Sequence, residues 1–222
     1  MSETFSTAHG LIAMVELSDD QIAEALAKLP EAERSYAETL SPVRRAEHVR
    51  GRSALHKAIA ELAPTVVDMP ILADDRGAPV LPPGWVGSVS HKEARAAALV
   101  TRASPISGAR IGVDLEKAAP SRIDISKRVL TANERDTLAA AHAHLEPGHP
   151  ERGRATTLRF SIKEAIYKAV DPFVRRYVAF TEVELDVQDG VAHVASELPF
   201  AIETTWQELD GFWLATARAQ RR

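Results

Sequence analysis

The stretch Phe160-Ser161-Ile162-Lys163-Glu164-Ala165-Ile166-Tyr167-Lys168-Ala169 decides the fold of this 222-residue chain. At about 100° per residue its apolar side chains fall on one stripe, which predicts an amphipathic helix with one face against a core. Lys163, Glu164 and Lys168 fall on the other side, so a carboxylate would lie between two ammonium groups. Such a face suits a metal ion together with an anionic ligand, although a solvated salt pair is the more common explanation.

A second stretch, residues 109–116, alternates between apolar and polar side chains and is predicted to form a strand. Asp114 and Glu116 would point to the same face, where two carboxylates repel each other unless a cation lies between them. Hard oxygen ligands of this kind favour Mg²⁺, which usually binds through a few carboxylates and substrate phosphates. A strand end that runs into an acidic turn is the alternative explanation.

Taken together, these two stretches form a pattern that a third motif extends. Gly112-Val113-Asp114-Leu115-Glu116, followed by residues 160–165 and Lys168, resembles the paired signature of the 4′-phosphopantetheinyl transferases, with the surfactin-type (Sfp-type) monomeric group as the nearer match. Gly87-Ser88-Val89-Ser90-His91 is similar to the branch associated with siderophore synthesis and with activation of actinobacterial carrier proteins. The resemblance extends from about residue 44 to about residue 185.

The resemblance implies an α+β fold of two similar α/β halves about a pseudo-twofold axis. Each half would have an antiparallel sheet and packed helices, and the ligand would occupy the cleft between them. Predicted strands at residues 94–101 and 109–116 are joined by a short connector, in which we place the boundary. Residues 1–105 would form the N-terminal half and residues 106–222 the C-terminal half.

The resemblance also implies an activity. The protein would transfer 4′-phosphopantetheine from coenzyme A to a serine of an apo acyl or peptidyl carrier protein and release 3′,5′-ADP. Phosphoryl transfer of this kind needs alignment, charge neutralisation and proton removal. Lys163 and Lys168 would meet the phosphates, and Glu164 or a metal-bound water would accept the serine proton. The implied ligands of Mg²⁺, with Mn²⁺ as its alternative, are Asp114, Glu116 and Glu164.

Glu134 has two interpretations. Thr131-Ala132-Asn133-Glu134 is a capping box, in which the glutamate caps the start of a helix. The family places an acidic residue near this position, so the resemblance makes Glu134 a further candidate base. Both interpretations stay open at this point.

Coenzyme A contacts are expected from both halves. Arg45 and Arg52 share one face of a helix predicted for residues 42–62, and the resemblance assigns them to the 3′-phosphate, although a solvated basic face is the alternative. Many relatives have Gly-Lys-Pro where this chain has Gly77-Ala78-Pro79, so the charge is expected from Arg76 instead. Ser90 and His91 are expected beside the pyrophosphate.

Composition limits the other classes of function. A net charge of −4 argues against a nucleic-acid partner, and the chain has no cysteine for a disulfide or a thiolate nucleophile.

No apolar run is long enough to cross a membrane and no signal-peptide pattern is seen, so a cytoplasmic location is expected. One chain carries both motifs, so a monomer would suffice. From their charge and position, Arg122, Lys127 and Arg128 are expected to contribute to the carrier-protein surface, although a solvated face explains them equally well.

Two other functions remain open, together with three local expectations. A silent relative would hold coenzyme A or a carrier protein without turnover, and an Mg²⁺-dependent hydrolase would cleave the coenzyme A pyrophosphate without an acceptor. Locally, residues 1–10 are expected to be loose and residues 146–154 to form a polar loop. Asp189-Gly190 and Asp210-Gly211 are expected to be hairpin turns.

Overall fold

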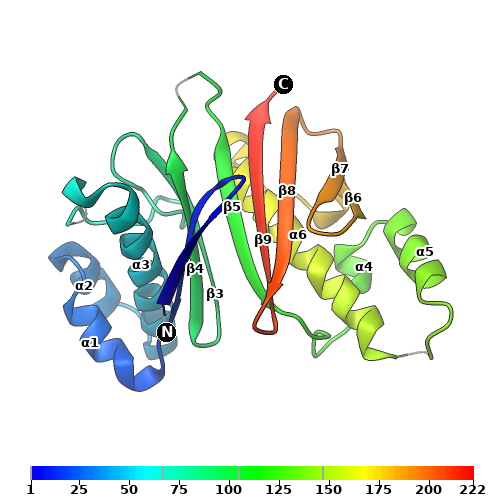
Figure 1. Ribbon diagram of the computed structural model, residues 1–222, viewed down its shortest axis with the longest axis horizontal. Helices are drawn as coiled ribbons and strands as arrows, with labels where there is room; N and C mark the ends of the chain where they lie inside the picture. Colours follow the sequence, from blue (N-terminus) through cyan, green and yellow to red (C-terminus); the bar gives the residue numbers. More distant parts are fainter. Residues whose placement is uncertain (1, 67, 105, 147) are drawn as a thin grey trace.

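The computed structural model describes residues 2–66, 68–104, 106–146 and 148–222. In this part of the chain the strands form a four-stranded, a three-stranded and a two-stranded sheet, all antiparallel. In chain order the elements are β1 (Ser2–Thr7), β2 (Gly10–Glu16), α1 (Ile22–Ala27), α2 (Glu31–Glu38), α3 (Pro42–Leu62), β3 (Trp85–Lys92), β4 (Arg95–Arg102), β5 (Arg110–Lys117), α4 (Ser126–Val129), α5 (Ala132–Ala141), α6 (Pro150–Val174), β6 (Val183–Val187), β7 (Ala192–Ser196), β8 (Phe200–Leu209) and β9 (Phe212–Arg221) (Figure 1).

The four-stranded sheet has the order β1-β2-β4-β3, and α3 covers one of its faces. Helix α3 begins with Pro42, whose missing N–H is not needed in a first turn. Because side chains alternate along a strand, Ala98 of β4 packs with Leu55 and Ile59 of α3, whereas Leu99 belongs to the opposite face. This sheet is therefore buried on both sides.

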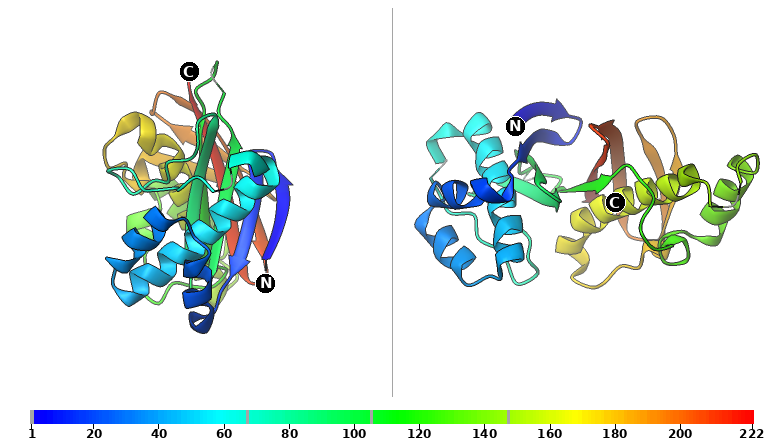
Figure 2. Two further views of the ribbon diagram at one scale, coloured as in Figure 1. Left: turned by 90° about the vertical axis from the view of Figure 1, so that its left-hand side faces the viewer. Right: turned by 90° about the horizontal axis from the view of Figure 1, so that it is seen from below.

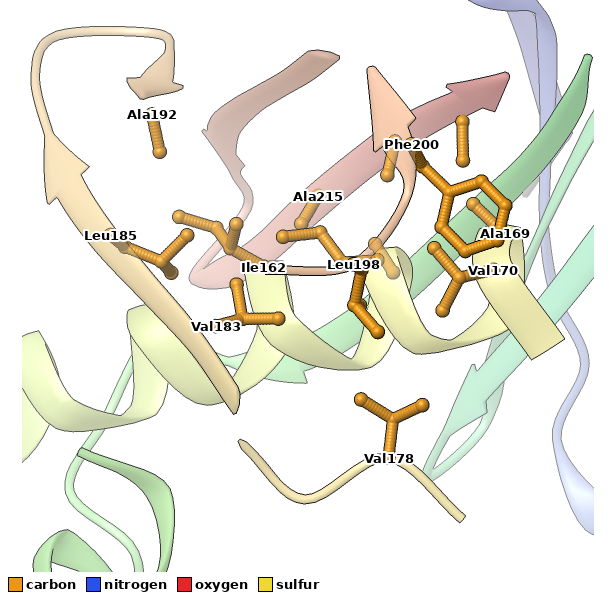
Figure 3. Packing of buried hydrophobic residues seen from close by; sticks show 14 of the residues in the cluster. Ile162, Ala169, Val170, Val178, Val183, Leu185, Ala192, Leu198, Phe200 and Ala215 are labelled. Carbon is orange, nitrogen blue, oxygen red and sulfur yellow. The ribbon is translucent and has the colours of Figure 1, made fainter. Parts of the chain in front are cut away.

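The three-stranded sheet, β5-β9-β8, lies against α6. Ile162 and Ala169 of the predicted apolar stripe are buried with Ala215 of β9 (Figure 3). A Cβ atom at Gly112 of β5 would lie 1.9 Å from the carbonyl oxygen of Ala165, so α6 approaches this strand closely only because the residue is glycine. The same face of β5 carries the two acidic residues of the strand toward α6.

Both sheets contribute to one core, and β3 of the first runs beside β5 of the second (Figure 1). Ile12 and Leu99 are buried there with Val113 and Leu214. The hydroxyl oxygen of Ser88 accepts a hydrogen bond from the Val113 N–H at 3.1 Å, which joins the two strands. Seen from below in Figure 2, the long helices α3 and α6 lie on opposite sides of the strands.

The predicted α+β fold is thus confirmed, whereas the exact division into halves stays a prediction. Residues 2–102 supply the four-stranded sheet and residues 110–221 the other two. The expected boundary falls at Pro105, which lies outside the described residues. The pseudo-twofold relation also remains a prediction, because the two large sheets differ in strand number.

Two local expectations are wrong. The region expected to be loose contains β1, which pairs with β2 from Ser2 opposite Val15 to Thr7 opposite Gly10. The expected polar loop ends early because α6 begins at Pro150, where the His149 side chain accepts a hydrogen bond from the Glu151 N–H. Both expected hairpin turns are confirmed, one between β6 and β7 and one between β8 and β9. Among the described residues, no helix is both long and apolar enough to cross a membrane.

Candidate functional site

Three carboxylates, those of Asp114, Glu116 and Glu164, lie within electrostatic range of one another where β5 lies against α6. Burial, followed by the charge of Asp114, raises the pKa of Glu164, and Glu116 adds to the shift. Burial is also the main cause that raises the pKa of Glu116, to which Asp114 contributes. The three residues expected to bind metal therefore lie near enough for their charges to act on one another.

Asp114 is buried and only half satisfied. Its Oδ1 accepts hydrogen bonds from Ser90 Oγ and Lys168 Nζ, both at 2.9 Å. Lys168 Nζ also donates to the carbonyl oxygen of Val113 at 2.9 Å. The second oxygen of Asp114, Oδ2, is buried and has no hydrogen-bond partner. A buried carboxylate oxygen without a partner is unfavourable, so this atom fits an additional cation.

Glu116 is held by a lysine that the sequence did not indicate. Lys92 Nζ lies 2.5 Å from Glu116 Oε2, and it opposes the effect of burial on the Glu116 pKa. Within the described ranges, no group of three or more His, Cys, Asp or Glu side chains is arranged so that it could hold a metal ion. The carboxylates at Asp114 and Glu116 are instead compensated by Lys168 and Lys92.

His91 lies between α3 and α6. Burial lowers the pKa of His91, and the nearby charges of Lys168 and Arg44 lower it further, whereas Glu47 raises it. Its Nδ1 is 3.9 Å from Glu47 Oε1. Ser90 donates to Asp114, and the charges of Asp114 and Lys168 act on His91, whereas the expected place of both residues beside the pyrophosphate stays a prediction. The exposed guanidinium of Arg44, paired with Glu47 at 3.0 Å, brings α3 into the site.

The two arginines expected at the 3′-phosphate have other surroundings. Arg45 donates from Nε to the carbonyl oxygen of Ala37 at 3.0 Å and from Nη2 to that of Glu38 at 3.2 Å, so it caps the end of α2. Arg52 is 5% exposed, and burial lowers its pKa while the nearby Glu33 raises it. Its Nε is buried without a partner. Helical spacing placed these residues on one face, but it could not show that Arg44 is the one nearer His91.

Arg76 fastens a loop of the first half to α6. Its Nε donates to Asp171 Oδ2 at 2.6 Å, its Nη2 donates to the other oxygen of Asp171, and Nη2 also lies 3.4 Å from the hydroxyl oxygen of Tyr167. A second ion pair joins Arg175 to Asp75 at 2.5 Å. The expected phosphate contact of Arg76 would therefore have to compete with a bidentate carboxylate.

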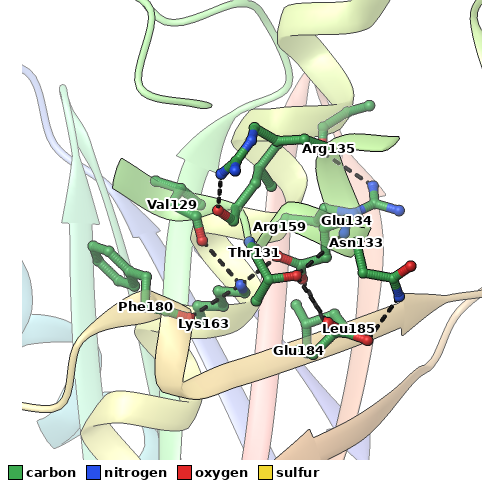
Figure 4. Close-up of polar contacts among 12 residues, drawn as sticks. Val129, Thr131, Asn133, Glu134, Arg135, Arg159, Lys163, Phe180, Glu184 and Leu185 are labelled. Carbon is green, nitrogen blue, oxygen red and sulfur yellow. Dashed lines mark hydrogen bonds and ion pairs between the residues drawn. The ribbon is translucent and has the colours of Figure 1, made fainter. Parts of the chain in front are cut away.

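Lys163 lies apart from Lys168, in a buried polar network (Figure 4). Its Nζ donates to Glu134 Oε2 at 2.7 Å and to the carbonyl oxygens of Val129 at 2.9 Å and Phe180 at 3.1 Å. All three donors of the ammonium group are thus used. The expectation that Lys163 and Lys168 flank Glu164 toward the ligand is wrong for Lys163, because its side chain is 1% exposed.

Glu134 is the partner that explains this burial. Besides Lys163, it accepts hydrogen bonds from the N–H groups of Thr131 at 2.7 Å and Leu185 at 2.9 Å. The predicted capping box is present, with the Thr131 hydroxyl accepting from the Glu134 N–H. These contacts favour the capping interpretation of Glu134 over a role as base.

A hollow of about 640 Å³ opens beside the carboxylate cluster. Glu116 and Glu164 line it, as do Val129 and Phe180, whose carbonyl oxygens bind Lys163. The remaining lining residues combine apolar and basic side chains. They include Lys92, Lys117, Arg122, Ile123, Ile125, Arg128 and Phe160.

Two models of known protein families together match most of the chain. The family described as the 4′-phosphopantetheinyl transferase N-terminal domain matches residues 32–101, and the 4′-phosphopantetheinyl transferase superfamily matches residues 110–217. The 4′-phosphopantetheinyl transferase PptT of Mycobacterium tuberculosis is 30% identical over 78% of this chain and 70% of its own. The transferase Svp of Streptomyces mobaraensis is 34% identical over 64% of this chain, and enterobactin synthase component D of Salmonella typhimurium is 28% identical over 75%.

The matched length is partial for some of these relatives. The aligned region spans 56% of Svp and 68% of the Salmonella typhimurium protein. A solved holo-(acyl-carrier-protein) synthase from Bacillus anthracis, in complex with CoA (3′,5′-ADP), aligns with a TM-score of 0.40 and 23% identity, over 50% of this chain and 96% of its own.

Proposed function

This chain belongs to the 4′-phosphopantetheinyl transferase superfamily, and we propose that it transfers 4′-phosphopantetheine from coenzyme A to a serine hydroxyl of an apo acyl or peptidyl carrier protein. The observation that carries the proposal is the cluster of Asp114, Glu116 and Glu164 beside Lys168 and His91. It joins hard anionic ligands to cationic groups at the junction of the two sheets, as transfer of a pyrophosphate-linked group requires.

The proposal includes Mg²⁺, with Mn²⁺ as its alternative. Carboxylate oxygens are the donors that these ions prefer, and the orphaned Oδ2 of Asp114 provides a buried one. Asp114, Glu116 and Glu164 would hold the ion after a change in their arrangement, because as described they do not yet form a metal site and Glu116 is paired with Lys92. When bound, it would supply neutralisation of negative charge on the pyrophosphate oxygens.

The chain's own residues would carry the remaining steps. The serine oxygen attacks the phosphorus that bears the pantetheine arm. The bond between this phosphorus and the bridging oxygen of the pyrophosphate breaks, and 3′,5′-ADP leaves. Lys168, half-buried against Asp114, would offset charge on the leaving phosphate. His91 and the exposed Arg44 would position the phosphates. Glu164 would accept the serine proton, which its burial favours.

The hollow is the proposed entrance for the acceptor. Glu116 and Glu164 of the cluster line it together with apolar side chains such as Ile123 and Phe160. Arg122 and Arg128 add positive charge, which would complement an acidic carrier protein. A monomeric state and a cytoplasmic location complete the proposal.

Intact-mass measurement of an apo carrier-protein panel tests this function. After incubation with the protein, coenzyme A and Mg²⁺, a gain of one phosphopantetheine that disappears with EDTA is expected. No gain on any carrier, together with retained coenzyme A binding, would instead support a silent relative. Release of phosphopantetheine from coenzyme A without any acceptor would support a pyrophosphate hydrolase.

A further inference from the structure

Two ion pairs connect the end of β3 and its following turn to the end of β5, and only one of them includes a proposed metal ligand. Lys92 pairs with Glu116 at 2.5 Å, and Lys117 pairs with Glu93 at 2.7 Å. Lys92 ends β3 and Glu93 follows it in the turn, whereas Glu116 and Lys117 are the last two residues of β5. Only Glu116 belongs to the carboxylate cluster, so Lys92 alone of the two lysines neutralises a proposed metal ligand.

Of the two lysines that pair with carboxylates of the cluster, Lys92 is held by fewer contacts than Lys168. Asp114 pairs with Lys168 and Glu116 pairs with Lys92, and the nearby charges of Lys168 and Arg128 act on Glu164. Lys168 is anchored by hydrogen bonds to Val113 and Asp114 and has 26% of its side chain exposed. Lys92 is bonded to Glu116 at the edge of the hollow, and 38% of its side chain is exposed.

We propose that Lys92 is a built-in counter-ion that holds Glu116 in the free protein and releases it when a divalent cation binds. This inference rests on the proposed function, because it concerns the same carboxylates. The ammonium group and the cation compete for one carboxylate, so the ion pair lowers the apparent affinity for the cation. The Lys92 side chain is 38% exposed and lines the hollow, so its ammonium group can leave Glu116 without disturbing the core.

Lys92 acts here as a positioning residue, and its effect is measurable without turnover. Binding of Mn²⁺ to the full chain, without coenzyme A, is followed by electron paramagnetic resonance of the free ion at fixed pH and ionic strength. Lys92→Met removes the charge and keeps the length of the side chain. We expect it to tighten Mn²⁺ binding roughly three- to tenfold, the range for loss of a partly exposed ion pair. Lys92→Arg keeps the competitor and should not tighten binding.

A matched control separates competition from general charge. Lys117→Met removes the same charge from the neighbouring strand end, where the partner is Glu93. It should change Mn²⁺ affinity less than twofold, roughly the scale of a screened surface charge. A double-variant cycle completes the test: in a Glu116→Gln background, Lys92→Met should have no effect on the affinity that remains.

The possible results distinguish a failure of the counter-ion proposal from a failure of the proposed metal site. Equal Mn²⁺ affinities for the unaltered chain and Lys92→Met, or equal gains for Lys92→Met and Lys117→Met, would overturn the counter-ion proposal and leave the metal site intact. Absence of Mn²⁺ binding by the unaltered chain and by both variants would overturn the counter-ion and the proposed metal ligands together.

Discussion

Lys163 and Glu134 form a buried ion pair, with 2.7 Å between Nζ and Oε2 and only 1% of each side chain exposed. The pair joins the start of α5 to the middle of α6, and its hydrogen bonds reach Val129, Phe180 and Leu185. Because Val129 and Phe180 line the hollow, the pair shapes the wall beside Glu164 without touching the proposed ligand.

Loss of Lys163 is expected to destabilise the protein rather than act only on catalysis. Lys163→Met leaves the Glu134 charge buried without its partner, which should cost about 3–5 kcal/mol of unfolding free energy. Urea denaturation measures this value. Lys28→Met, which removes an exposed ion pair with Glu24, is the matched control and should cost at most about 0.5 kcal/mol. Equal losses for the two lysines would contradict the structural role.

A second prediction concerns the close approach of β5 and α6. Gly112→Ala places a Cβ atom where the Ala165 carbonyl oxygen lies, so the helix must move away from the strand. We expect a loss of about 2–3 kcal/mol in unfolding free energy and a larger fall in transfer activity, because Asp114 and Glu164 separate. Gly51→Ala, in helix α3, is the control. Its new Cβ atom would lie 3.2 Å from a methyl group at the end of the Val89 side chain, which can shift slightly to make room. A stability loss at Gly112 no larger than at Gly51 would refute the contact.

These two sites show what sequence can predict here. The alternation of residues 109–116 and the stripe on α6 are local patterns, so the strand and the helix could be predicted from them, whereas the nearness of Asp114 to Glu164 is expected only from the family resemblance. The burial of Lys163 depends on a partner 29 residues earlier, and no helical period reveals it. Likewise, Arg45 caps α2 because of how two helices pack, which spacing within one helix does not determine.

Buried His9 should make stability depend on pH. Its Nδ1 is hydrogen-bonded to Thr216 Oγ1 at 2.7 Å, which fastens the β1–β2 turn to β9, and burial together with Arg218 lowers its pKa to about 4. The neutral ring is favoured by folding, so this contribution is complete above the unfolded value near 6.5 and is lost as the pH falls from there toward 4.

A substitution isolates that contribution. Between pH 7.5 and pH 4.5 the unaltered chain should lose about 2 kcal/mol more unfolding free energy than His9→Asn, which cannot gain a proton. Urea denaturation at the two pH values gives the difference. His193→Asn, on an exposed position of β7, should leave the pH dependence unchanged. Parallel pH profiles for the unaltered chain and His9→Asn would show that His9 is not the group responsible.

The role of Asp114 can be separated from its place in the fold. Asp114→Asn preserves the shape of the side chain but removes the negative charge that faces Lys168 and the orphaned oxygen available to a cation. We expect at least about a 100-fold fall in carrier-protein modification, the scale for loss of one preorganised electrostatic contact. Asp20→Asn, on the exposed surface, is the control and should behave as the unaltered chain. Near-normal modification by Asp114→Asn at ordinary Mg²⁺ would remove Asp114 from the proposed metal ligands.

The bidentate pair of Arg76 and Asp171 distinguishes two roles for one arginine. If Arg76 serves only to fasten its loop to α6, Arg76→Ala and Asp171→Asn should destabilise the protein to a similar extent and leave the KM for coenzyme A similar in both. If Arg76 also binds phosphate, Arg76→Ala alone should raise KM, because Asp171→Asn frees the guanidinium for the ligand. We expect the second result, since the hydroxyl of Tyr167, which also lies near the guanidinium, comes from the helix that carries Lys168. Matching KM values for the two variants would restrict Arg76 to the first role.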